Sequence, residues 1–221
     1  MSRVVAVALT CCLCWSATQA DAQGLLGKPY VSSQYMTFKP GGDFDSLETS
    51  NRNGGRIQGS IPLIVSEGES GWSCGMDGFG TFSGASFKVR DPSFAALSVN
   101  ASIIGGDLGL NLFTRATEDI RPFVQLGVNW AQTEVRGSFG PFTFSERDTE
   151  TSLIVAGGVE VDVFPNTALR ASYGKGTDGL GGTGFLGELV FRPMDNWFGR
   201  FSVNVDKDEN IIGGFGVGYA W

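Results

Sequence analysis

The chain has 221 residues, of which 42% are hydrophobic and 18% are charged, and its formal net charge is −7 at pH 7. The length suits one barrel or sandwich domain, and the hydrophobic content excludes a disordered chain. The acidic balance argues against a nucleic acid as partner, and the 33 glycines disfavour helix.

The N-terminus has the pattern of a secretory signal peptide. Arg3 provides a short positive region, residues 4–15 form an apolar run, and small residues stand at Ala20 and Ala22. The run is shorter than the roughly 20 residues that a membrane helix needs, so we expect cleavage after Ala22 and not an uncleaved anchor.

This processing sets the domain organisation and the cysteine content. We expect a signal peptide at 1–22 and one domain at 23–221. Three of the four cysteines fall inside the signal, so only Cys74 remains and no intramolecular disulfide can form.

Beyond the signal, apolar side chains recur at every second position in segments of about ten residues. Such alternation is typical of β-strands, and about ten residues is the length with which a tilted strand crosses a membrane. We predict ten strands, with a Gly-rich, weaker segment at 72–83; an alternative has eight strands, with 57–83 arranged differently. In chain order the segments lie at 31–37, 57–65, 72–83, 107–112, 123–130, 153–163, 169–173, 185–192, 200–205 and 211–221.

The predicted connections alternate in length. Short turns lie near 66–71, 114–119, 164–167 and 194–197. Longer loops lie near 39–55, 84–105, 136–149 and 178–184, and the link at 206–210 is short. Short periplasmic turns and longer outer loops are typical of membrane barrels. The sequence therefore predicts an all-β fold, a closed antiparallel transmembrane β-barrel with both termini on the periplasmic side.

The C-terminal strand carries the strongest single signal. Phe215, Val217, Tyr219 and Trp221 share one face, while the opposite face is mostly small. A soluble strand would be polar on its outer face, so this pattern favours a lipid-facing strand. Gly216, Tyr219 and Trp221 also resemble the assembly signal that the barrel-assembly machinery recognises. A glycine at 214 and Trp in place of Phe at the end depart from its common form.

These segments resemble the small outer-membrane β-barrel proteins of diderm bacteria, the OmpA-like and OmpW-like porin-family group. Residues 28–31 and 38–40 resemble their first strand, 121–128 their recurring "RPFVGAGVG" strand, and 157–161 the strand that follows. The resemblance implies a monomeric protein of the outer membrane. It also implies contact with outer-membrane lipids and lipopolysaccharide, and with the assembly machinery during biogenesis. It implies function poorly, because this fold hosts pores, adhesins and enzymes.

The chemistry of the side chains argues against an enzyme. The chain has no histidine, whereas the barrel enzymes of similar size rely on one as a base or as a partner to a nucleophile. We predict no catalytic residue, no cofactor and no metal site. The GxGxxG match at 179–184 lies between strands and not before a helix, and Asp206–Asn210 lacks the glycine and distal glutamate of an EF-hand loop.

Charged residues occupy many of the predicted inward positions. Acids and arginines there are nearly balanced in number, which favours a lumen closed by ion pairs, whereas a conducting pore more often has a bias of one sign. We predict a structural or surface-exposed role, with a small-solute channel as the alternative and a barrel enzyme as the third possibility. The predicted lumen network consists of Arg121, Glu160, Asp162, Arg170, Glu188, Arg192 and Arg200.

Overall fold

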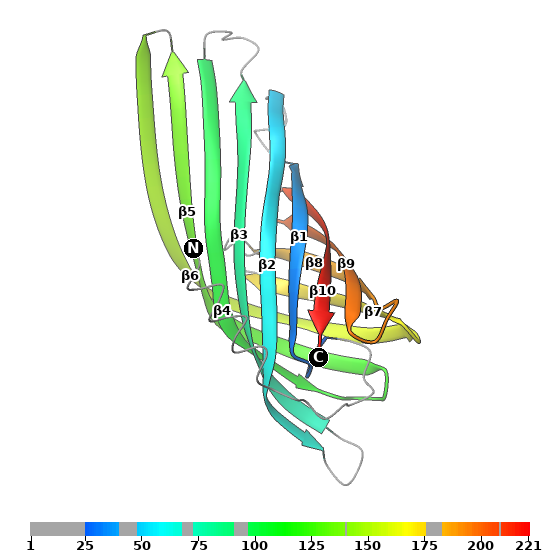
Figure 1. Ribbon diagram of the computed structural model, residues 1–221. Helices are drawn as coiled ribbons and strands as arrows, with labels where there is room; N and C mark the ends of the chain where they lie inside the picture. The colour runs from blue at the N-terminus through cyan, green and yellow to red at the C-terminus, as the bar shows by residue number, and fades with distance from the viewer. Residues whose placement is uncertain are drawn as a thin grey trace.

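The computed structural model describes residues 25–39, 48–67, 73–90, 97–139, 141–175, 183–207 and 209–221. The predicted signal peptide, Trp72 and most of the 179–184 glycine run lie outside these ranges. The described residues form a closed antiparallel barrel (Figure 1). Its strands are β1 (Tyr30–Lys39), β2 (Glu48–Glu67), β3 (Ser73–Arg90), β4 (Leu97–Thr114), β5 (Ile120–Phe139), β6 (Phe142–Phe164), β7 (Thr167–Lys175), β8 (Thr183–Phe191), β9 (Trp197–Asp206) and β10 (Ile211–Ala220).

Neighbours in sequence are neighbours in the sheet, and the barrel closes where the first strand meets the last. β1 pairs with β10 from Tyr30 opposite Ala220 to Lys39 opposite Ile211. The prediction of ten strands in an all-β barrel is confirmed, and the eight-strand alternative is wrong. In the described part of the chain, no helix is long and apolar enough to cross a bilayer.

The strands fall into two length classes. β1 and β7–β10 have 9 or 10 residues, which matches the length of a membrane-crossing strand. β2–β6 have 18 to 23 residues, about twice that length. The long strands therefore rise well beyond the short ones on one side of the barrel (Figure 1).

The long strands correct three predicted loops. Residues 48–55 of the loop predicted at 39–55 belong to β2, much of 84–105 belongs to β3 and β4, and almost all of 136–149 belongs to β5 and β6. Outside lipid, a paired strand needs no apolar face, because water solvates its side chains. Polar segments therefore continue the hydrogen-bonded ladder where the sequence pattern indicated loops.

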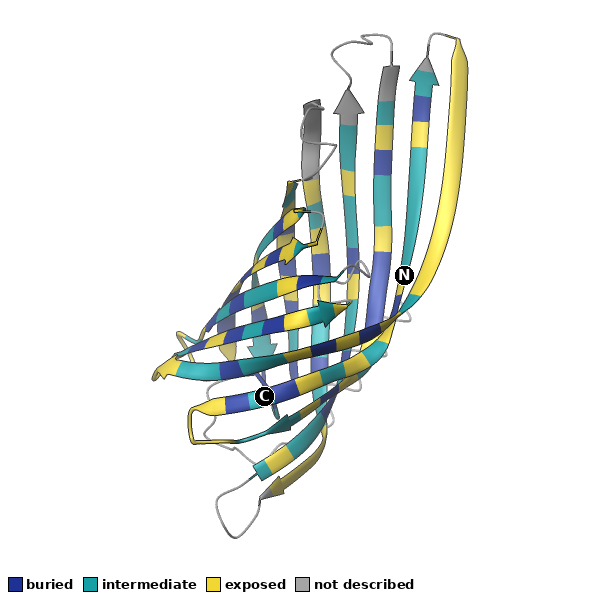
Figure 2. Ribbon diagram, turned by 180° about the vertical axis from the view of Figure 1, so that it is seen from behind, coloured by how far each residue is buried: buried dark blue, intermediate teal, exposed yellow. Residues whose placement is uncertain are grey.

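Buried and exposed residues alternate along the short strands (Figure 2), as expected when successive side chains point to the outside and to the lumen. On β5, Val124, Leu126 and Val128 are exposed, while Phe123 and Asn129 are buried. The same outward apolar pattern recurs on β4, β9 and β10. The barrel thus has an apolar outside and a polar inside, the reverse of a soluble barrel.

On β5 the apolar outer band ends at Trp130, which contacts a second aromatic ring. The rings of Phe82 and Trp130 lie 6.3 Å apart on the outer face of the long strands. Beyond Trp130 on the same face of β5 stand Gln132, Glu134 and Arg136. Aromatic residues typically mark a membrane interface, so this change in polarity marks where the outer face leaves the apolar band.

One irregularity in β2 has a local cause. The pairing with β3 shifts between Pro62 and Ile64. Proline has no backbone N–H to donate to the ladder, so within a sheet it is tolerated at bulges. The shift lets the strand continue past Pro62.

Candidate functional site: the barrel lumen

A belt of alternating charge crosses four neighbouring strands inside the barrel. Arg121 on β5 lies opposite Glu160 on β6, which lies opposite Arg170 on β7. Arg170 in turn lies opposite Glu188 on β8. All four side chains are buried. The register places these four charges side by side in one row, where unlike charges attract across strands.

Arg121 joins the two acids of β6. Its Nε donates to Glu160 Oε1 at 3.0 Å, and its Nη2 donates to Asp162 Oδ1 at 2.5 Å. Glu160 and Asp162 are two residues apart, so both point into the lumen. One guanidinium is shared by two carboxylates, and this group alone carries one excess negative charge.

Glu188 lies between two arginines. Arg200 on β9 donates to Glu188 Oε1 from Nε at 3.0 Å and also from Nη2. Arg170 Nε stands 3.9 Å from the other oxygen, and its guanidinium lies 4.2 Å from the centre of the Phe123 ring. This second group carries one excess positive charge, which offsets the first.

The remaining member of the predicted network lies at the end of a strand. Arg192 directly follows β8, its side chain is half-buried, and its backbone N–H donates to the Asn166 carbonyl at 2.8 Å. The sequence analysis missed Arg56 on β2, which is buried in the lumen. Its position two residues before Gln58, on the polar face of the segment, could have identified it.

The segment before β1 lies inside one end of the lumen. The backbone N–H groups of Leu25 and Leu26 donate to the two oxygens of Glu160 at 3.2 and 3.3 Å. The N–H of Gly27 donates to Asp77 Oδ2 at 2.8 Å. Hydrogen bonds to an ionised acceptor are the stronger kind, so three consecutive amides tie this segment to two strands.

Apolar contacts hold the same segment. Leu25 is 2% exposed and belongs to a cluster of buried apolar side chains that closes this end of the lumen. Tyr30 packs edge-on against Phe198, with ring centres 5.8 Å apart. The sequence resemblance covered Lys28 but gave no reason to place Leu25 inside. The other members of the cluster are Tyr30, Ala168, Val190, Phe198 and Ala220.

Lys28 lies beside this closed end. Burial, together with the guanidinium charges of Arg192 and Arg121, lowers the pKa of Lys28 to about 8. Asp162 and Glu160 act in the opposite direction. Burial and the nearby arginines therefore outweigh the nearby carboxylates.

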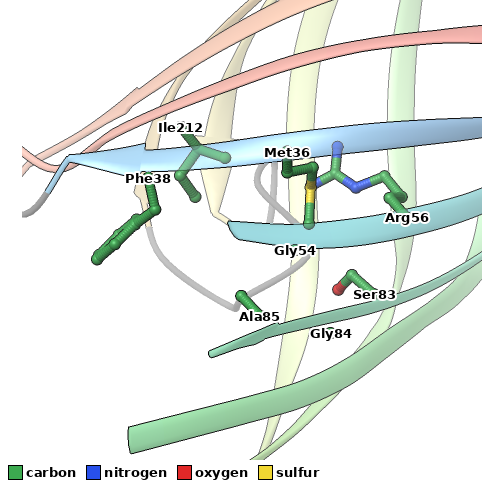
Figure 3. Close-up of a pocket in the computed structure, with 8 residues that line it drawn as sticks. All are labelled: Met36, Phe38, Gly54, Arg56, Ser83, Gly84, Ala85 and Ile212. Carbon is green, nitrogen blue, oxygen red and sulfur yellow. The ribbon is translucent and has the colours of Figure 1, made fainter. Parts of the chain in front are cut away.

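Two small cavities lie in the lumen. A cavity of about 30 Å³ lies among polar residues that include Gln58, Asp107 and Arg170, and a second of about 20 Å³ lies among apolar ones. Arg56 lines both cavities, and Figure 3 shows it beside Met36 and Ser83 at the second. Cavities of this size hold a few water molecules at most.

The three residues of the predicted assembly signal occupy different environments. Tyr219 stands between Trp197 and Trp221, at ring distances of 5.4 and 6.1 Å. The Trp221 N–H donates to the Pro29 carbonyl at 3.2 Å, next to the seam of the barrel. Gly216 faces inward opposite Gln34, and a side chain there would approach the Ser33 carbonyl to 2.0 Å. Each residue thus has a structural role in the closed barrel.

The link between β9 and β10 is held by hydrogen bonds of its own. Asp206 accepts hydrogen bonds from the Asn210 backbone and side chain at 2.9 and 2.7 Å, which makes the link a hairpin turn. Within the described ranges, no group of three or more His, Cys, Asp or Glu residues could hold a metal ion. Cys74 is exposed.

Two solved structures are among those similar to this chain. The transport unit of the autotransporter AIDA-I from Escherichia coli matches with a TM-score of 0.59 and 12% identity, over 97% of each chain. Ail, the attachment invasion locus protein of Yersinia pestis, matches with a TM-score of 0.41 and 16% identity, over 88% of this chain and 99% of that one. No curated protein sequence matches the chain significantly.

The family comparison identifies the class of the protein. The model of the outer membrane protein beta-barrel domain matches residues 5–206, which is most of the chain. This match agrees with the ten-strand barrel, its apolar outside and its polar lumen. The chain belongs to the outer membrane protein beta-barrel domain family, whose place is the outer membrane.

Proposed function

We propose that this protein is a non-conducting outer-membrane barrel that displays its long strands at the cell surface. The observation that carries the proposal is the lumen itself, in which the charge belt, the apolar cluster around Leu25 and the side chain of Arg56 surround two small cavities. Open aqueous channels are typical of barrels with many more strands. A structural or surface role fits a lumen of this kind.

The long strands supply the surface. β6 pairs with β7 from Val155 onward, and residues 142–151 of β6 are all exposed. On the outer face Glu134 forms ion pairs with Arg136 at 2.7 Å and with Arg147 at 3.7 Å. We call residues 131–139 and 142–151 the β5–β6 extension. Its polarity suits water on the side of the barrel opposite the termini.

The proposal includes the orientation and the partners. Both termini lie on the periplasmic side after cleavage behind Ala22, and the extension faces outward. Outer-membrane lipids and lipopolysaccharide surround the apolar band, and the assembly machinery recognises the C-terminal strand. The protein acts as a monomer and is not an enzyme, which its histidine-free sequence supports.

Conductance in planar bilayers tests the closed lumen. We expect negligible conductance for the wild type and measurable conductance for the double variant Arg192→Ala, Arg200→Ala, because Glu188 loses its best donor. Steady, ohmic wild-type channels that discriminate among small solutes would make a small-solute channel the better function.

Labelling of intact cells tests the display. In a Cys74→Ser background, Ser145→Cys places a thiol on the β5–β6 extension, and Glu118→Cys places one in the turn at the opposite end. A membrane-impermeant maleimide should label the first in intact cells and the second only after permeabilisation. The reverse pattern would contradict the proposed orientation.

A further inference from the structure

The segment from Leu25 to Lys28 is a formed turn with a defined seat. The Lys28 N–H donates to the Leu25 carbonyl at 3.3 Å, which closes a four-residue turn. Gly27, the third residue, has φ of +77°, as a type II turn requires. The turn directs three successive N–H groups, those of Leu25, Leu26 and Gly27, toward carboxylates.

The two carboxylates come from strands that are far apart in sequence. Glu160 lies on β6 and Asp77 on β3, and both side chains are fully buried. Glu160 also accepts a hydrogen bond from Arg121. For Asp77, the donor among the described residues is the Gly27 amide, which binds Oδ2, and the Oδ1 atom has no hydrogen-bond partner there. A buried carboxylate without donors is costly, so Asp77 in particular depends on the segment.

We propose that Glu160 and Asp77 form a peptide-binding site at the end of the lumen, and that its resident ligand is the chain's own segment 25–28. The segment is a removable plug. The ligand class is a short peptide with a large apolar side chain at the Leu25 position, three free amides in succession and glycine at the turn. The inference rests on the proposed closed lumen and names the part that closes one end.

The side chain and the backbone of the plug have separate roles. Leu25 packs in the apolar cluster with Phe198 and Val190, where burial of an aliphatic side chain favours binding. The backbone amides bind the two carboxylates, and this binding does not depend on which side chains the peptide carries. A peptide that retains both leucines but has N-methyl groups at residues 26 and 27 therefore separates these two contributions.

Complementation in trans tests the plug. A variant that lacks residues 25–27 is reconstituted in planar bilayers and titrated with a synthetic peptide of residues 23–29. We expect the deletion to conduct where the wild type is closed. The peptide should block this current from one side only, and the N-methylated peptide should block it at least tenfold more weakly. Asp77→Asn in the same background should also weaken the block about tenfold, because a charge-assisted hydrogen bond becomes a neutral one.

The outcomes distinguish the plug from the closed lumen. A closed wild type with an equally closed deletion variant overturns the plug and leaves the proposed function intact. A wild type that conducts overturns the proposed function. In that case, a peptide that leaves the deletion variant's current unchanged overturns the plug as well, whereas one-sided block supports it.

A labelling measurement keeps the test decisive if the deletion variant does not fold. In a Cys74→Ser background, Leu26→Cys places a thiol at a position that is 3% exposed, and Thr117→Cys places one in an exposed turn. We expect the first thiol to react at least tenfold more slowly, and Asp77→Asn to accelerate it several-fold. Equal rates for the two thiols would overturn the plug.

Discussion

Arg200 directs both Nε and Nη2 to the same carboxylate oxygen of Glu188, with Nε at 3.0 Å. Both side chains are buried, and they come from adjacent strands, β9 and β8. The other oxygen faces Arg170 at 3.9 Å. Glu188 thus gains most from Arg200, and this pair is the most direct point at which to test the charge belt.

We expect Arg200→Ala to destabilise the folded barrel by about 3–5 kcal/mol, because it leaves a buried carboxylate with one distant partner. Urea unfolding of the barrel in detergent or lipid would measure the loss. The double variant Arg200→Met, Glu188→Gln is the matched control, since it removes both charges, keeps an acceptor beside Arg170 and should recover part of the stability. Equal stability of Arg200→Ala and wild type would show that the pair contributes nothing.

The apolar band predicts that the free-energy cost of an outward-facing charge depends on its depth in the membrane. Leu126 and Gln132 lie on the same outer face of β5, on opposite sides of Trp130. Leu126→Arg places a charge within the band and should cost about 2–4 kcal/mol, whereas Gln132→Arg should cost about 0–1 kcal/mol. Unfolding in lipid vesicles measures both. Equal costs for the two variants would show that Trp130 does not mark the boundary.

The sequence was sufficient for the strand count and the side-chain alternation, because lipid imposes an apolar outer face on every crossing strand. It was insufficient for the lengths of β2–β6. Water imposes no such pattern beyond Trp130, so residues such as Ser145 and Thr149 carry no sign of the ladder to which they belong. The pairing there is set by the neighbouring strand, which single-strand periodicity does not report.

The lumen site could be predicted from the sequence only in part. The residues of the charge belt could be named from alternation, but their depth depends on the register, which sequence alone does not fix. The role of the N-terminal segment was missed altogether. Leu25 and Leu26 precede the first strand and have no periodicity. Their partner Glu160 is 135 and 134 residues away in the sequence, and Asp77 is 50 residues from its partner Gly27.

The C-terminal aromatic cluster predicts a defect in assembly. Trp221→Asp places a charge next to Tyr219 and removes a ring from the cluster with Trp197. We expect less protein in the outer-membrane fraction. A smaller share of the protein should show the heat-dependent change in gel mobility that marks a folded barrel. Trp221→Phe, which retains an aromatic ring, is the control and should behave as wild type. Normal insertion of Trp221→Asp would contradict a role for this residue in assembly.

Lys28 gives the plug a dependence on pH. Its pKa is lowered to about 8 in the folded protein and has an ordinary value of about 10.4 in an unfolded chain. Below pH 8 the ammonium is charged in both states, so the folded state bears the full cost of burying that charge and of holding it near Arg192 and Arg121. As pH rises from 8 to 10.4, the folded state loses the proton first, and this cost disappears.

Lys28→Met should therefore be more stable than wild type at pH 7, and the difference should shrink as pH rises toward 10.4. Thermal unfolding midpoints of the two proteins, measured at matched pH values by heat-modifiable gel mobility, give that difference directly. Other groups that titrate in this range act on both proteins and cancel. If Lys28→Met is instead the less stable protein at pH 7, the ammonium stabilises the plug through Glu160 and Asp162. The attraction of these carboxylates would then outweigh burial and the repulsion by the arginines.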